Sequence, residues 1–99
     1  MINNYENIYI LKGSLTEEQA LKEIEIIKEY FKGTEIYEKE DDKNGYLGRK
    51  KLAYNIKEEE YGYFYLTHFK STFQKATKIE EKLKANDNVM KFITVKMDD

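Results

Sequence analysis

Two stretches with helical periodicity, each with strand-like segments on both sides, constrain the fold of this chain more than any other feature. Alternating segments rich in Ile, Tyr, Phe and Val predict strands at residues 5–12, 34–56, 61–70 and 89–96. Apolar residues three or four positions apart predict the inward face of each helix. These residues are Ala20, Ile24, Ile27 and Phe31 in the first helix, and Phe73, Ala76, Ile79 and Leu83 in the second.

Turn and capping signals separate these elements. Ser14, with Glu17 three residues later, predicts a capping box at the start of the first helix, and Gly33 predicts its end. The segment Asp41–Gly45 contains an Asn-Gly pair, which predicts a turn or bulged loop that interrupts the second strand.

The resulting order, strand-helix-strand-strand-helix-strand, predicts an α+β fold. With right-handed crossovers it gives the ferredoxin-like split βαβ plan, a four-stranded antiparallel sheet with two helices on one face. The sequence contains no linker, repeat or low-complexity tract, so we expect residues 1–99 to form a single domain. Many functions use this plan, so the fold alone identifies none of them.

The charge balance limits how such a domain could bind a nucleic acid. The chain has 17 basic and 19 acidic side chains, so its net charge of -2 provides no overall attraction to phosphates. Residues 1–48 carry 6 basic and 11 acidic groups, whereas residues 49–99 carry 11 and 8, so an anionic partner would prefer the second half. The absence of cysteine and of a membrane-length apolar run predicts a cytosolic protein without disulfides, thiolate metal sites or a membrane span.

The residues give no support for catalysis. His68 is the only histidine, and no nucleophile is arranged with it by a recognisable motif, so we expect a packed or surface side chain. The carboxylates of Asp41-Asp42 and Glu58–Glu60 fall in predicted turns, where charged runs are usually solvated. Gly45–Gly48 matches the Gly-x-x-Gly clamp of an RNA-binding module, but that clamp joins two helices and this segment precedes a strand. We therefore expect no enzyme activity, cofactor, metal site or small-molecule substrate.

Three adjacent cations, Arg49, Lys50 and Lys51, lead directly into the strand segment 52–56. A second strand, rich in Tyr and Phe, follows after a short connection. Cations beside aromatic residues on paired strands can contact phosphates and stack on bases, which favours RNA binding. The same run is also typical of a charged edge strand that resists aggregation, and composition does not separate these two roles.

Ordered sequence segments along nearly the full chain match a known pattern. They are Tyr5-Glu6 with Tyr9–Leu11, then Leu47–Ile56, Gly62–Phe64 and Asn86–Lys91. Together they resemble the bacterial small-subunit ribosomal protein S-six family, and the Gly-x-basic-x-Leu-Ala-Tyr-x-Ile element is the most specific part. The chain differs from that family at Ile2–Asn4, where basic residues are usual, and at Asn55, where the family has proline. It also has Leu47 in place of a frequent Trp.

The resemblance implies the ferredoxin-like fold and a non-enzymatic protein of the cytoplasmic ribosome. Members of the family join ribosomal protein S-eighteen, and the pair binds the central domain of small-subunit ribosomal RNA, so both are expected partners. An acidic balance is familiar in this family, which removes the conflict with RNA binding. The candidate RNA-binding residues are Arg49, Lys50, Lys51, Tyr54 and Lys91.

An RNA-recognition motif, a single-strand RNA binder with the same element order, is the alternative interpretation. The two interpretations expose opposite faces of the sheet, because side chains alternate along a strand. The recognition motif would expose Tyr9, Tyr63 and Tyr65 for base stacking. The ribosomal resemblance instead leaves a solvent-facing apolar cluster on the other face as the candidate partner surface: Ile8, Ile10, Phe64 and Leu66.

Overall fold

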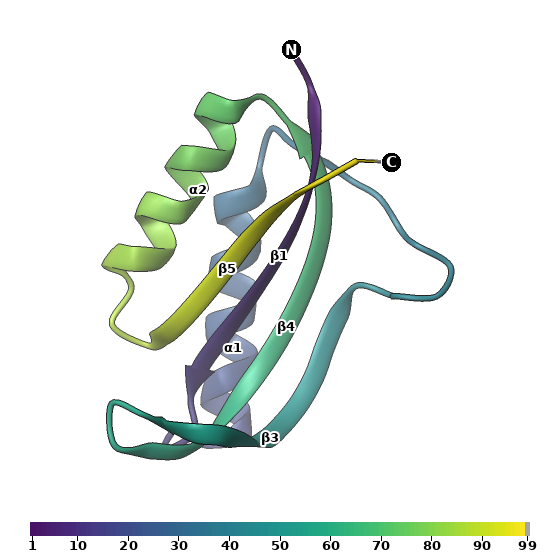
Figure 1. Ribbon diagram of the computed structural model, residues 1–99. Coiled ribbons are helices and arrows are strands. Elements are labelled where there is room, and N and C mark those ends of the chain that lie inside the picture. Colours follow the sequence, from purple (N-terminus) through teal and green to yellow (C-terminus); the bar gives the residue numbers. More distant parts are fainter. Residues whose placement is uncertain (99) are drawn as a thin grey trace.

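The computed structural model describes residues 1–98 and shows two helices packed on one face of an antiparallel sheet (Figure 1). Its elements are, in chain order, β1 (Asn3–Lys12), α1 (Glu17–Lys28), the 3₁₀ turn η1 (Glu29–Phe31), β2 (Glu35–Ile36), β3 (Gly45–Ile56), β4 (Glu59–Ser71), α2 (Phe73–Ala85) and β5 (Val89–Met97). The predicted α+β, ferredoxin-like split βαβ fold is confirmed.

Strands β1 and β4 form the centre of the sheet. β1 pairs antiparallel with β4 on one side, where Ile8 lies opposite Leu66, and with β5 on the other. β2 and β3 both pair with the outer edge of β4, β2 at Phe69 and Lys70 and β3 from Leu66 towards the hairpin. The sheet has five strands where four were predicted. The difference arises because the predicted edge strand is interrupted and forms two separate strands, β2 and β3, along the same edge of β4.

The side chain of Asn44 holds the edge of the sheet together at the interruption. Its Oδ1 accepts a hydrogen bond from the backbone N–H of His68 (2.8 Å), and its Nδ2 donates to the carbonyl oxygen of Tyr37 (2.9 Å). The backbone N–H of Tyr37 in turn donates to the carbonyl oxygen of His68 (3.0 Å). We call residues 37–44 the edge loop. An amide side chain thus supplies the hydrogen bonds that a continuous strand would have made.

One face of each helix packs against the sheet and forms the main core. The predicted inward residues are buried with one exception, Phe73, which is 67% exposed. Phe73 is the first residue of α2, and helical side chains tilt towards the N-terminus, so no helical turn holds its ring against the sheet. The largest apolar side chains that are fully buried are Tyr9, Leu11, Ile27, Phe69, Ile79 and Leu83.

The capping box of α1 forms two residues later than predicted. Thr16 is the N-cap: its Oγ1 accepts from the N–H of Gln19 (3.1 Å), and Gln19 Oε1 accepts from the N–H of Thr16 (2.9 Å). The N–H of Ser14 instead donates to Glu59 Oε1 at 2.8 Å, which ties the β1–α1 connection to the start of β4. The prediction was wrong because Thr-x-x-Gln offers the same pair of bonds once the chain has turned out of β1. Gly33 follows η1 with a φ of +86°, in agreement with the predicted end of the helical segment.

The connection between β3 and β4 is shorter than the sequence suggested. Ile56 pairs with Glu59, so the hairpin has only two central residues, Lys57 and Glu58. Both have positive φ angles, +48° and +66°, as the tight hairpin turns that match strand twist require. Glu59 and Glu60 therefore belong to β4 rather than to a charged loop.

Candidate functional site

The face of the sheet beneath the helices contains the tyrosines that a recognition motif would expose. Tyr9 and Tyr63 are buried there. Tyr9 stacks on Tyr65 with ring centroids 5.4 Å apart, and the Tyr63 hydroxyl donates to the carbonyl oxygen of Leu15 (2.7 Å). Rings held in the core cannot stack on bases, so the observed register is the one that the ribosomal resemblance implies.

The opposite face, which we call the open face, carries the four predicted apolar residues. Ile8 and Phe64 are half-buried on this face. Ile10 and Leu66 are only 8% and 3% exposed. The prediction that all four face solvent is therefore wrong for Ile10 and Leu66, although their side of the sheet is correct.

The distal part of β3 contributes to a second, smaller core on the open face. Leu52 packs with Ile10 and with Met90 of β5, and Ile56 and Phe64 pack against this group. This packing explains the burial of Ile10, which strand periodicity could not reveal. It leaves a shallow groove of about 230 Å³, the open-face groove, lined by Ile8, Ile10, Leu52, Ala53, Tyr54, Ile56, Phe64, Lys91 and Ile93.

Three candidate RNA-binding residues gather on the open face. The ammonium group of Lys50 lies 5.9 Å from the centroid of the Phe64 ring. Lys91 donates a hydrogen bond to the hydroxyl of Tyr54 (3.0 Å), and its ammonium group lies 5.5 Å from the centre of the same ring. Tyr54 remains 65% exposed, so its ring is accessible to a partner.

The other two candidates point to the opposite side of β3. The guanidinium of Arg49 lies 4.4 Å from the centroid of the Tyr61 ring, and its Nε and Nη2 donate to the carbonyl oxygen of Gly13 at 3.3 and 3.2 Å. Arg49 therefore fastens β3 to the β1–α1 connection. Lys51 shares this side because side chains two residues apart lie on the same face of a strand. The basic run is thus divided between two surfaces.

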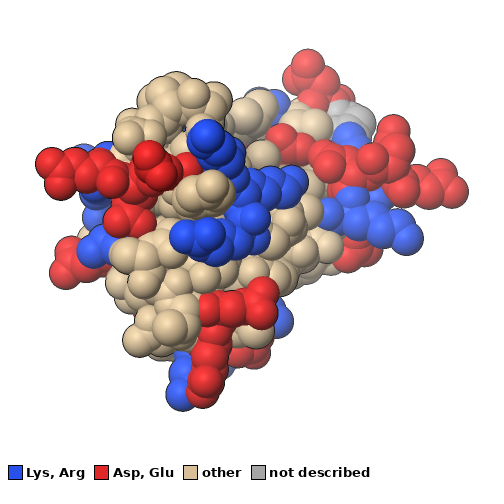
Figure 2. All heavy atoms as spheres, turned by 90° about the horizontal axis from the view of Figure 1, so that it is seen from below, with Lys and Arg blue, Asp and Glu red and all other residues tan. Residues whose placement is uncertain are grey.

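The end of the molecule that contains β3 and its hairpin carries both cations and carboxylates (Figure 2). Figure 2 shows this end from below, with Lys and Arg side chains gathered near the centre and Asp and Glu side chains around them. Acidic groups therefore border the central cations on several sides (Figure 2). This arrangement agrees with the net charge of -2 and favours a few specific phosphate contacts over a broad basic surface.

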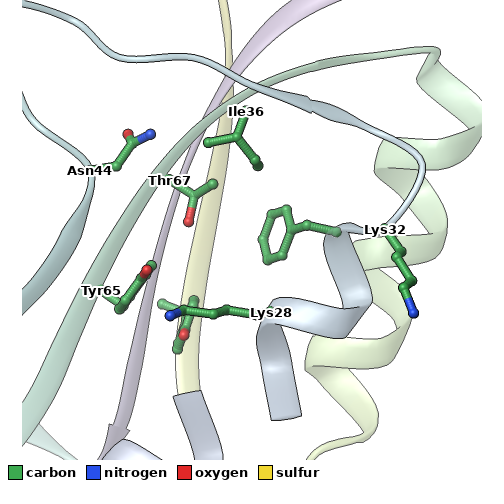
Figure 3. Close-up of a pocket in the computed structure, with 8 residues that line it drawn as sticks. Lys28, Lys32, Ile36, Asn44, Tyr65 and Thr67 are labelled. Carbon is green, nitrogen blue, oxygen red and sulfur yellow. The ribbon is translucent and has the colours of Figure 1, made fainter. Parts of the chain in front are cut away.

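A pocket of about 300 Å³ lies between α1 and the edge of the sheet (Figure 3). The hydroxyl of Tyr9 is buried there without a hydrogen-bond partner, and burial raises the pKa of this phenol well above its usual value. Lys28 extends towards Tyr65, and its Nζ is paired with Glu25 at 2.7 Å. Sequence patterns did not indicate this pocket because the edge loop helps to form it. Its lining is Tyr9, Lys28, Phe31, Lys32, Ile36, Asn44, Tyr65 and Thr67.

These features define a small α+β protein whose open face combines an apolar groove with nearby cations. Residues 4–96 match the family model described as Ribosomal protein S6. The chain belongs to the ribosomal protein S6 family, which places it among the proteins of the small subunit of the cytoplasmic ribosome. The resemblance drawn from the sequence segments is confirmed.

Individual relatives agree with this assignment. The small ribosomal subunit protein bS6 of Sulfurovum sp. is 34% identical over 97 residues, covering 96% of this chain and 72% of that protein. The protein of the same name from Helicobacter acinonychis is 34% identical over 98 residues, covering 98% of this chain and 66% of that protein. The crystal structure of ribosomal protein S6 from Thermotoga maritima has the same fold, with a TM-score of 0.84 at 21% identity, over 98% of this chain and 89% of that one. Within residues 1–98, neither helix is long and apolar enough to cross a membrane.

Proposed function

We propose that this chain is a non-enzymatic structural component of the small ribosomal subunit. In this proposal it binds the central domain of small-subunit ribosomal RNA jointly with ribosomal protein S-eighteen. The observation that carries the proposal is the open-face groove, where apolar side chains lie beside the cations Lys50 and Lys91. Apolar side chains suit a protein contact and cations suit phosphates, so one face offers both kinds of contact.

The apolar part of the open face supports a protein partner. Ile93 and Val95 of β5 are 52% and 46% exposed. Ile93 lies opposite the half-buried Ile8 and lines the open-face groove together with Phe64, whereas Val95 lies opposite Glu6. Fully burying such a side chain contributes roughly 1.5–3 kcal/mol before the costs of association are subtracted. A partner that covers this area would therefore gain most of its affinity from apolar contact.

The cationic part of the open face supports a small number of RNA contacts. Lys50 and Lys91 could neutralise two phosphates, and Tyr54 presents an exposed ring beside them. Each neutralised phosphate contributes a slope of about 0.7–0.9 in the dependence of log affinity on log salt. The chain alone should therefore bind RNA weakly and with a shallow salt dependence, and the partner protein should supply the remaining contacts.

Binding to a ribosomal RNA central-domain fragment across a salt series tests this proposal. We expect weak binding by the lone chain and much tighter binding by its mixture with ribosomal protein S-eighteen. Changing Lys50 and Lys91 together to Ala should weaken the ternary complex and reduce its salt slope by roughly 1.4–1.8. The matched control changes Lys78 and Lys84, which are exposed on α2, and should leave binding unchanged. Tight, steeply salt-dependent binding by the lone chain would contradict the proposal, as would equal losses in both double variants.

A further inference from the structure

His68 lies where side chains from β1, β4 and the edge loop converge. Its side chain is 0% exposed, and it is the only histidine in the chain. The ring Nε2 lies 3.0 Å from Glu6 Oε2 and 3.5 Å from Asp42 Oδ2. Each of these three residues offers one atom that could bind a metal ion, and these three atoms all lie within 4.8 Å of one another. Each residue comes from a different segment, so only the folded chain assembles the group.

The position of the ring hydrogen of His68 follows from Asn44. The amide of Asn44 cannot be reversed, because Oδ1 accepts from the His68 backbone N–H and Nδ2 donates to the Tyr37 carbonyl. The same Oδ1 lies 2.7 Å from His68 Nδ1. An amide oxygen only accepts hydrogen bonds, so Nδ1 carries the hydrogen and donates it. In the neutral imidazole, Nε2 therefore directs its lone pair towards the two carboxylates.

We propose that Glu6, Asp42 and His68 form a binding site for a divalent transition-metal ion, with zinc as its representative. One neutral imidazole and two carboxylates carry a charge of -2, which a divalent ion balances. A proton on Nε2 would leave the group with a net charge of -1 and a single N–H facing two acceptors. Imidazole nitrogen and carboxylate oxygen are both ordinary zinc ligands.

The geometry agrees with this assignment. Tetrahedral zinc bonds of about 2.0–2.2 Å place neighbouring ligand atoms roughly 3.3–3.5 Å apart. The two distances from Nε2, 3.0 and 3.5 Å, lie close to this separation. Asp42 is half exposed, which gives the ion a route from solvent and leaves room for water as a fourth ligand. The bond from Nδ1 to Asn44 fixes the ring, as outer partners of zinc-binding histidines commonly do.

Metal binding by the complete chain, first stripped with a chelator, tests the site. Zinc is titrated by calorimetry and cobalt(II) by visible absorption, and His68 is the only imidazole that either ion can bind. We expect one ion per chain, a higher melting temperature with zinc, and a shift of the Nε2 nitrogen resonance while Nδ1 keeps its hydrogen. Absence of saturable binding would overturn the proposal. So would a zinc-treated protein in which both ring nitrogens carry hydrogen, because His68 would then form only an ion pair.

Two neighbouring aspartates provide a matched pair of variants. Asp42→Asn should lower zinc affinity roughly tenfold or more, by analogy with losses at supporting residues of metal sites. Because Asp42 is half exposed, the metal-free variant should fold with the stability of the parent. Asp41→Asn changes an exposed carboxylate outside the group and should bind zinc like the parent. Equal losses in the two variants would show that any binding is non-specific attraction to the acidic loop, and the proposal would fail.

Discussion

Replacing Asn44 by alanine would test whether one side-chain amide takes the place of the interrupted strand ladder. Asn44 Oδ1 accepts hydrogen bonds from the backbone N–H and ring Nδ1 of His68, at 2.8 and 2.7 Å. Its Nδ2 donates to the Tyr37 carbonyl at 2.9 Å. Alanine removes all three bonds without introducing a bulky group. The edge loop would then lose its main polar attachment to β4.

The size of the loss follows from the burial of His68. An unpaired buried donor costs about 1–3 kcal/mol, and Asn44→Ala leaves two such donors on a residue that is 0% exposed. The carbonyl of Tyr37 belongs to a half-buried residue, so water can reach it at lower cost. We therefore expect the free energy of unfolding to fall by about 2–6 kcal/mol. For a domain of this size, the melting temperature should fall by at least about 8 °C.

Urea unfolding in the presence of a chelator measures this loss without a contribution from bound metal. Asn55→Ala is the matched control, because Asn55 is exposed on β3, and its unfolding free energy should stay within about 0.5 kcal/mol of the parent. A loss below about 0.5 kcal/mol for Asn44→Ala would refute the reasoning. The edge loop would then be held by other contacts.

Three further substitutions test the roles of individual side chains. Arg49→Ala should lower the unfolding free energy by about 1 kcal/mol, because its hydrogen bonds to the Gly13 carbonyl are lost. Lys51→Ala should change it by less than about 0.5 kcal/mol. Equal losses for the two variants in urea unfolding would contradict a structural role for Arg49 alone. Tyr9→Phe removes a buried hydroxyl that has no partner and should leave stability unchanged or raise it by up to about 1 kcal/mol. A clear fall in the melting temperature of Tyr9→Phe would mean that the hydroxyl is hydrogen-bonded in solution.

Local periodicity was sufficient to predict the element order and the faces of the helices. It also grouped Ile8, Ile10, Phe64 and Leu66 on one face of the sheet, because alternation along a strand depends only on the backbone. Periodicity did not show which face the helices cover, and the family resemblance made that assignment. It could not predict that Ile10 is buried, since this depends on Leu52, which lies far along the chain. Exposure is a property of tertiary packing, whereas the side of a strand is a local property.

Adjacency in sequence was similarly a poor guide to shared surfaces. Arg49 and Lys50 are neighbours in the sequence, but strand alternation sends them to opposite sides of β3. Conversely, His68 looked isolated because Glu6 and Asn44 are 62 and 24 residues away. The cluster around His68 depends on the pairing of β1 with β4 and on the path of the edge loop. No short sequence pattern contains that information.

Calorimetric titration with ribosomal protein S-eighteen tests the central claim, that the open face receives the partner, most directly. Ile93→Ser changes an exposed apolar residue of the open-face groove, and Leu21→Ser changes an exposed apolar residue of α1 as the control. Neither change should disturb folding, because both side chains are substantially exposed. We predict that Ile93→Ser weakens pairing roughly tenfold or more, a loss of about 1.4 kcal/mol or greater, while Leu21→Ser pairs like the parent. Unchanged pairing by Ile93→Ser, or an equal loss in Leu21→Ser, would contradict the claim.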